Sequence, residues 1–140
     1  MTVEVQDQPL VEAIPATAEL RPPDRGQTDE DDLMPYAILD RLMDHFVQRG
    51  QDPVQIFRSL WPELSRRYNG APRAFAAHIR KFVRMFCIAQ WKRERYAIGF
   101  RVTAFDLDPK TGLRWPPVQA PFTEELAELD RYVATIDGET

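Results

Sequence analysis

Apolar side chains recur at the spacing of an α-helix in four separate segments of this chain of 140 residues. Prolines and glycines lie mostly between these segments, where they mark the point at which one helix ends and the next begins. The periodicity predicts helices over four stretches of the chain: 34–49, 53–61, 72–94 and 123–136. Two short stretches, 10–14 and 100–105, have the pattern of strands. The sequence therefore predicts a mainly α protein.

The ends of the predicted helices carry recognisable capping chemistry. Asp32 is the candidate cap of the first helix, and Gly50 ends it. Asp52 precedes a proline and begins the second helix by the same logic. Pro62 is predicted to kink or restart that helix, since proline lacks the N–H that a helix interior needs. Thr123 is the predicted cap of the last helix.

Composition excludes several classes of protein. The formal net charge is -4 and the isoelectric point is about 5.2, so nothing indicates binding to nucleic acid or to an anionic membrane. A single cysteine, Cys87, excludes an internal disulfide and a multi-cysteine zinc site. We interpret it as a small core residue, and His45 and His78 as structural helix residues. With no signal peptide and no long apolar run, a cytoplasmic location is expected.

Two charged runs each have a structural and a functional interpretation. The acidic run 29–32 is expected to cap a helix start, and adjacent acids alone make a weak metal site, so no metal ligand is assigned. Lys92, Arg93 and Arg95 lie beside Trp91 at the end of the longest predicted helix. Such a cluster either is solvated and complements the helix dipole, or presents charge to a phosphate or carboxylate. Composition leaves both alternatives open.

Three motifs resemble segments of one enzyme family. Thr-Ala-Glu-Leu-Arg-Pro at 17–22 and Gln-Thr-Asp-Glu at 27–30 are followed by a Pro-Tyr that opens a helix. Phe-Cys-Ile-Ala-Gln-Trp-Lys-Arg at 86–93 ends the longest predicted helix in an aromatic residue and a lysine. Together they resemble the NAD synthetases, in particular the glutamine-dependent branch. The resemblance covers roughly residues 9–118.

The resemblance implies a fold, a reaction and binding residues. The family's synthetase domain is an adenine-nucleotide hydrolase-like α/β fold, of which this chain would be the C-terminal helical part. With ATP and Mg²⁺ the family adenylates the carboxylate of deamido-NAD, and ammonia then displaces AMP. Thr17 matches the hydroxyl at the ATP site, and Lys92 matches the lysine that contacts deamido-NAD. Trp91 stands where the family often has histidine, and its indole can donate a hydrogen bond but cannot accept one. No catalytic residue is assigned.

The chain also departs from the family pattern. The Ser-Gly-Gly-x-x-Ser loop, whose backbone N–H groups cradle the leaving pyrophosphate, is absent, and so is the Glu-Lys-Cys set of the amidase. We therefore expect the isolated chain to be inactive and to bind no ATP or Mg²⁺ alone. The chain is interpreted as a truncated product or a mis-assigned start, or else as a split subunit partnered by the missing synthetase half or an amidase subunit.

The expected organisation has three parts. Residues 1–32 form an irregular arm or linker with the ATP-site motif, 33–118 form the helical synthetase part, and 119–140 form a helix of unknown role. The family implies homo-oligomers. The alternative is an independent helical module that uses its basic helix end to bind an acidic protein partner.

Overall fold

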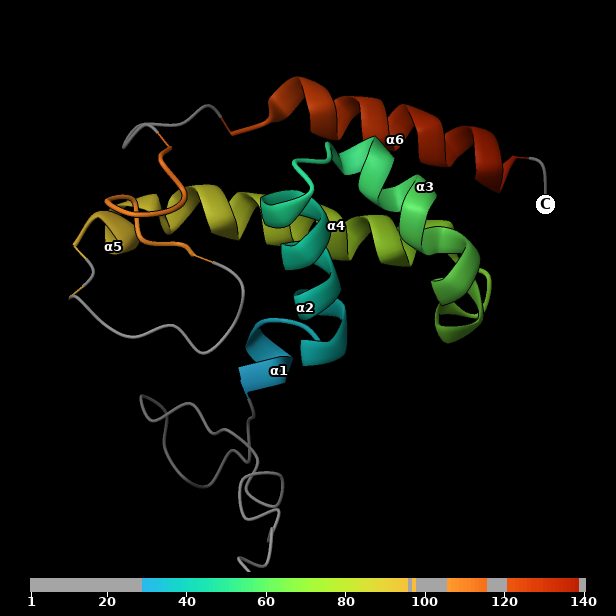
Figure 1. The fold of residues 1–140 in the computed structure, drawn as a ribbon. Helices are drawn as coiled ribbons and strands as arrows, with labels where there is room; N and C mark the ends of the chain where they lie inside the picture. Colours follow the sequence, from blue (N-terminus) through green and yellow to red (C-terminus); the bar gives the residue numbers. More distant parts are fainter. Residues whose placement is uncertain (1–28, 96, 98–105, 116–120, 139–140) are drawn as a thin grey trace, which may run out of the picture. The chain divides into compact units, whose positions relative to one another are not determined.

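A computed structural model describes residues 29–95, 97, 106–115 and 121–138, and in these ranges every regular element is a helix (Figure 1). The helices are α1 (Asp29–Asp32), α2 (Tyr36–Met43), the π-helical turn η2 (Asp44–Gln48), α3 (Pro53–Leu64), the 3₁₀ turn η3 (Ser65–Tyr68), α4 (Pro72–Ile88), α5 (Gln90–Glu94) and α6 (Thr123–Asp137). The mainly α prediction is confirmed for this part of the chain. The predicted strands at 10–14 and 100–105, and the arm up to residue 28, lie outside it.

The chain divides into two compact units, 1–36 and 37–140, each of which is considered by itself. In the first unit, α1 is a separate short helix rather than the start of a longer one. The prediction that Asp32 caps a helix beginning at residue 34 is wrong. Instead, the backbone N–H of Tyr36 donates to Glu30 Oε1 at 2.6 Å, and α2 begins at Tyr36. Pro35 precedes that first turn and has no N–H to be satisfied.

In the second unit, α3, α4 and α6 pack against one another around an apolar core, with α6 lying along α3 and α4 (Figure 1). The apolar side chains that these helices bury almost completely include Ile56, Phe57, Leu60, Phe75, Ile79, Val83, Leu126, Leu129 and Val133. Phe57 joins the three helices, because its ring lies 5.4 Å from that of Phe75 and 6.0 Å from that of Tyr132. Burial of each large apolar side chain contributes about 1.5–3 kcal/mol.

The entry into α3 follows its sequence signals. Asp52 Oδ1 accepts the N–H of Gln55 at 2.8 Å, and Gln55 Oε1 accepts the N–H of Asp52 at 3.1 Å. This reciprocal pair is a capping box, and Pro53 occupies the first helical position. Gly50 has a left-handed φ of 62°, as expected of a residue that ends a helix. The predicted cap at Asp52 and end at Gly50 are both confirmed.

Three other boundaries differ from the predictions. Helix α3 runs through the exposed Pro62 to Leu64, so of the two predicted outcomes, a kink or a restart, the restart is wrong. Thr123 is the first residue of α6 and not its cap; the capping position belongs to Phe122, at φ 55°. The ring of Phe122 lies 5.5 Å from that of Phe46, and this packing fixes the entry to α6. The helix predicted over 72–94 is interrupted at Ala89, which has ψ near 3°.

A polar pair joins η3 to α4. The hydroxyl of Tyr68 and Nδ1 of His78 are 2.6 Å apart, and both side chains are half-buried. Burial lowers the pKa of the His78 imidazole, and the cations of Lys81 and Arg67 lower it further. Burial also raises the pKa of Tyr68. Both shifts favour a neutral pair in which the phenol donates to the imidazole, so His78 has the structural role predicted for it.

His78 should make the fold less stable in mild acid. Because its folded-state pKa is lowered, the unfolded chain binds more protons, and stability is lost as pH falls through the ordinary histidine range near 6.5. His78→Gln keeps an acceptor for Tyr68 but does not titrate. Urea unfolding between about pH 7.5 and about pH 5.5 should show a larger loss of stability in the wild type than in His78→Gln. Equal losses in the two proteins would contradict this role.

Candidate functional site

The two predicted substrate-binding residues of the second unit lie on α5, the short helix that follows α4. Trp91 is 54% exposed and Lys92 is also exposed. Lys92 Nζ lies 5.8 Å from the centroid of the Trp91 ring, and the guanidinium carbon of Arg95 lies 5.9 Å from it. An exposed indole flanked by two cations offers a flat surface for stacking together with positive charge for an anionic group.

Arg93 fixes the position of α5. Its Nη2 donates to the carbonyl oxygen of Phe86 at 2.7 Å and to Gln90 Oε1 at 2.6 Å. Its guanidinium carbon lies 3.9 Å from the centroid of the Phe86 ring. Burial lowers the pKa of Arg93, while Cys87 and Glu94 oppose that shift. The basic cluster is therefore divided: Arg93 points inward as a structural residue, and Lys92 and Arg95 are exposed.

Gln90 connects α5 to a distant segment of the chain. Its side chain is only 2% exposed, and its Nε2 donates to Glu94 Oε1 at 2.9 Å and to the carbonyl oxygen of Trp115 at 3.4 Å. The Trp115 ring lies 5.1 Å from that of Phe86 and 5.3 Å from that of Phe46. Sequence reasoning missed the structural roles of Gln90, Arg93 and Trp115. The i, i+3 spacing of a glutamine and an arginine just beyond an aromatic residue was the available signal.

The segment 106–115 is an ordered turn rather than a ligand cluster. Asp106 uses both carboxylate oxygens inside it, accepting from the Asp108 N–H at 3.1 Å and from the Thr111 hydroxyl at 2.9 Å. Asp108 in turn accepts the N–H of Lys110 at 2.8 Å. At Gly112 a Cβ would lie 2.4 Å from Cγ of Asp106, so only glycine fits. The loop predicted here is confirmed for the described residues.

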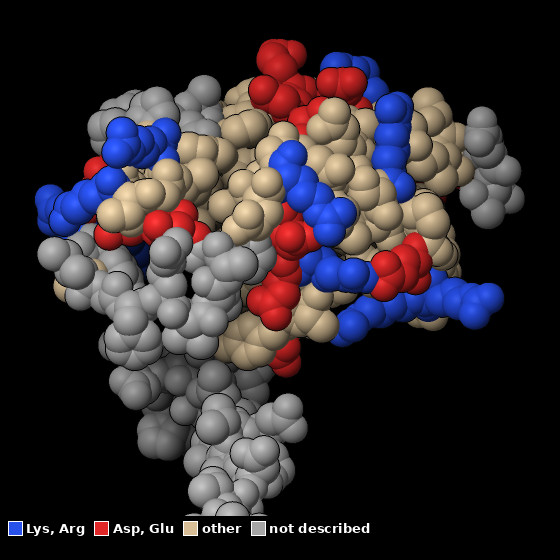
Figure 2. Space-filling model, viewed as in Figure 1, with Lys and Arg blue, Asp and Glu red and all other residues tan. Residues whose placement is uncertain are grey.

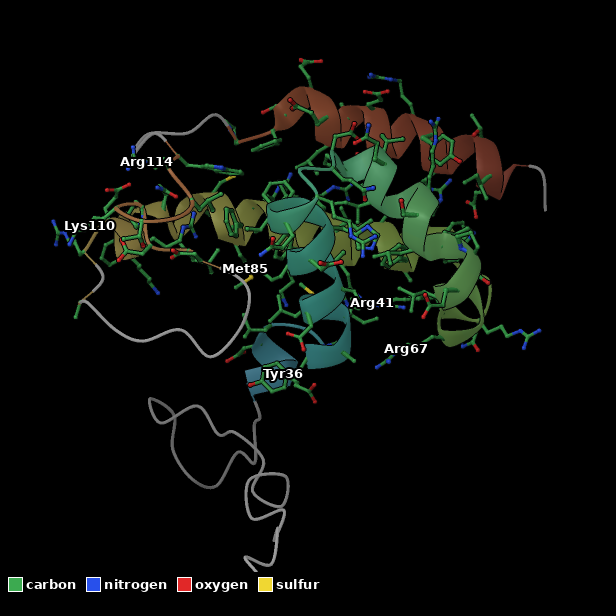
Figure 3. The ribbon with its side chains drawn as sticks, in the orientation of Figure 1. Tyr36, Arg41, Arg67, Met85, Lys110 and Arg114 are labelled. Carbon is green, nitrogen blue, oxygen red and sulfur yellow. The ribbon has the colours of Figure 1, made fainter. Side chains whose placement is uncertain are left out.

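Basic side chains lie at the end of the second unit that α5 occupies, with acidic side chains among them (Figure 2). Lys110 and Arg114 of the ordered turn lie at this end as well (Figure 3). Both are exposed, like Lys92 and Arg95. The nearby carboxylates of Asp106 and Asp108 already accept hydrogen bonds within the turn. The exposed surface around Trp91 therefore carries the cations of Lys92, Arg95, Lys110 and Arg114 together with the exposed carboxylate of Glu94.

The remaining predicted residues contribute less to this site. Thr17, the predicted ATP-site hydroxyl, lies outside the described residues. Cys87 is half-buried rather than a full core residue, and burial raises the pKa of its thiol while Arg93 lowers it. His45 is buried, with Nδ1 2.6 Å from Gln51 Oε1. A helix-stabilising role thus fits both histidines.

No metal site is formed in the described part of the chain. Magnesium requires several oxygen ligands in octahedral geometry, but nowhere in 29–95, 97, 106–115 and 121–138 do three His, Cys, Asp or Glu side chains converge. Within the same ranges, no helix has the length and apolar character needed to cross a bilayer.

The inward hydrogen bonds of Arg93 can be tested by substitution. Arg93→Lys keeps the charge but loses the planar fork that reaches Phe86 and Gln90 together. We expect the free energy of unfolding in urea to fall by about 1–2 kcal/mol. The matched control is Arg95→Lys, an exposed position two residues away, where the change should stay within about 0.5 kcal/mol. Equal effects at the two positions would show that Arg93 has no special structural role.

No protein-family model matches the chain. The glutamine-dependent NAD(+) synthetase of Thermotoga maritima is 32% identical over 89 residues, which are 64% of this chain and 13% of that protein. The glutamine-dependent NAD(+) synthetase of Rhodobacter capsulatus is 33% identical over 105 residues, 72% of this chain and 16% of that protein.

A solved structure agrees with the sequence matches. The crystal structure of a glutamine-dependent NAD(+) synthetase from Cytophaga hutchinsonii superimposes with a TM-score of 0.63 at 35% identity, covering 71% of this chain and 17% of that one. The chain thus spans no more than about a sixth of the length of these proteins. It is a homologue of the glutamine-dependent NAD(+) synthetases that corresponds to a small part of their length.

Proposed function

We propose that this chain serves NAD synthesis by contributing part of the deamido-NAD binding site of a synthetase. The observation that carries the proposal is Trp91, an exposed indole with Lys92 and Arg95 near its ring, on a segment homologous to synthetases. An exposed aromatic ring flanked by cations offers a face for stacking and positive charge for an anionic ligand. An anionic nucleotide supplies both the flat ring and the negative charge that this surface lacks.

The residues would divide the binding between them. Lys92 would place its ammonium against an anionic group of deamido-NAD, and Trp91 would offer its ring face and its N–H donor. Arg93 and Gln90 would act only by holding α5 in place. Thr17 would donate a hydrogen bond to a phosphate of ATP, as the family resemblance implies.

The chemistry of amidation would need groups that this chain does not carry. In the proposed parent reaction, ATP adenylates the carboxylate of deamido-NAD, pyrophosphate leaves, and ammonia displaces AMP. The charge that builds on the leaving pyrophosphate must be stabilised by preorganised donors, which the absent glycine-rich loop would supply. ATP, Mg²⁺ and a cytoplasmic location belong to the proposal through the parent enzyme. The proposal also includes an α/β domain, of which these helices would be part, and a homo-oligomeric parent enzyme.

A second candidate function is an independent helical module that binds a protein partner. One observation favours it: α3, α4 and α6 bury an apolar core of their own. Cooperative unfolding together with protein binding, but no response to deamido-NAD in any context, would favour this candidate.

The isolated chain should not catalyse the reaction. Incubated with ATP, Mg²⁺, deamido-NAD and ammonia, the purified 140-residue chain should release no AMP above the rate without enzyme. Chromatographic detection of AMP provides the measurement, and the Cytophaga hutchinsonii synthetase is the positive control. Deamido-NAD-dependent AMP release by the pure chain would contradict the proposal.

Lys92 can be tested in a chimera in which this chain replaces the matched segment of the Cytophaga hutchinsonii synthetase. Lys92→Ala should raise the KM for deamido-NAD about tenfold, a loss of about 1.4 kcal/mol of binding, because a cation facing an anionic substrate is removed. The KM for ATP should change little.

The matched control in the same chimera is Lys110→Ala. Lys110 is equally a lysine on the exposed basic end of the unit, but it lies on the ordered turn and not on α5. Its removal should leave the KM for deamido-NAD within about twofold. If both substitutions had the same effect, binding would depend on the general positive field and not on Lys92.

A further inference from the structure

Helix α4 has an unbalanced charge. Its 17 residues include four cations, Arg73, Arg80, Lys81 and Arg84, and no acid at all. A basic helix without acids cannot stabilise itself through pairs on its own surface. Its cations therefore must be solvated or must meet acids that belong to other elements.

Helix α6 supplies acids for one side of α4. Arg73 Nε lies 2.6 Å from Asp137 Oδ2, and Arg80 forms an ion pair with Asp130. Between these pairs the two helices enclose a shallow groove of about 220 Å³ that Ala76 and Val133 help to line. The contact between α4 and α6 thus combines an apolar centre with acids that meet the cations of α4.

The side of α4 that points away from the core also combines cations with apolar side chains, but no acid of the described residues pairs with its cations. At 100° per residue, six positions lie opposite the buried stripe and define the outer face of α4: Ala74, Ala77, Lys81, Arg84, Met85 and Ile88. Ile88 is 72% exposed and Met85 is 39% exposed (Figure 3 labels Met85). Within the described residues, Lys81 and Arg84 take part in no ion pair.

We propose that the outer face of α4 is a docking surface for the remainder of the synthetase polypeptide, which meets it with an apolar surface that carries acids. This inference rests on the proposed function. The homologous synthetases extend far beyond the matched segment, since this chain spans 13% to 17% of their length. Lys81 and Arg84 select acids on the partner, and Met85 and Ile88 supply apolar area for it to bury.

Docking at this face also explains how the substrate site is completed. Ile88 is the last residue of α4 and is followed within three positions by Trp91. A polypeptide that contacts Ile88 therefore also lies next to the exposed indole of Trp91 and the cations of Lys92 and Arg95. It excludes water on one side of the ligand and strengthens the charge interaction of Lys92.

The test uses the full chain and the Cytophaga hutchinsonii synthetase from which the matched segment has been deleted, here called the deleted body. Affinity is measured by isothermal titration calorimetry at low and high salt. The wild-type chain should bind the deleted body, and the affinity should fall as salt is added because the contact is charge-complementary. The double variant Lys81→Glu/Arg84→Glu should bind at least about tenfold more weakly, with a smaller dependence on salt.

The matched control reverses two cations on other exposed surfaces, Arg66→Glu/Arg131→Glu, which changes the net charge by the same amount. It should bind within about threefold of the wild type. Ile88→Glu is a second variant: the position is exposed, so folding survives, and burial of the new charge should weaken binding about tenfold. Circular dichroism establishes that each variant is folded.

Each result decides between the proposals. Equal weakening by the two double variants, or no binding by the wild-type chain, overturns the docking surface. The docking surface is also overturned if the chain self-associates and Ile88→Glu abolishes that self-association, because a second copy of the chain would then occupy the outer face of α4. If the chain binds the deleted body as expected but the complex and the chimera make no NAD, the docking surface stands and the proposed function fails.

Discussion

The packing of the second unit depends on the buried apolar stripe of α4. Phe75, Ile79 and Val83 are buried where α4 meets α3 and α6, so this one stripe determines how three helices pack. The same stripe continues to Phe86, whose ring and carbonyl oxygen receive the guanidinium of Arg93. One stripe of side chains on α4 therefore connects the core of the second unit to α5, which carries the exposed Lys92 and Arg95. The outer side of the helix remains available for contacts of another kind.

Phe46 has a comparable role at the end of the core that lies next to α5. Its ring is 4% exposed and contacts four other rings, those of Phe82, Phe86, Trp115 and Phe122. These edge-to-face contacts join η2, α4, the ordered turn and the entry to α6. Aromatic pairs of this geometry contribute about 0.5–1.5 kcal/mol each beyond their buried area. The cluster explains why segments that are distant in sequence meet close to α5.

Much of the helical architecture was predictable, because local chemistry determines it. Apolar periodicity located the helices, and the capping box at Asp52 began α3 where the sequence predicts. The errors arose where tertiary contacts override local preference. The break at Ala89 accompanies the binding of Arg93 to Phe86, and Phe122 displaces Thr123 as the cap because its ring is buried in the aromatic cluster. Neither contact is visible as a periodicity.

The candidate site was predictable in part. Trp91 and Lys92 followed from a family resemblance, and no periodicity or spacing would have selected them over Arg93. The inward orientation of Arg93 depends on the carbonyl oxygen of Phe86, and backbone acceptors leave no trace in a sequence. Thr17 lies outside the described residues, so its assignment remains a prediction.

The break at Ala89 separates α4, which packs the core, from α5, which carries the exposed Trp91 and Lys92. The buried stripe before it belongs to the close-packed interior, where even a change of one methylene group affects packing. Residues after it are attached to that interior through the side chains of Gln90 and Arg93. Under the proposed function, substitution at Trp91 or Lys92 would alter ligand binding at little cost to folding, because both side chains are exposed. The exposed surface of α5 can therefore change its chemistry while the packing of α3, α4 and α6 is kept.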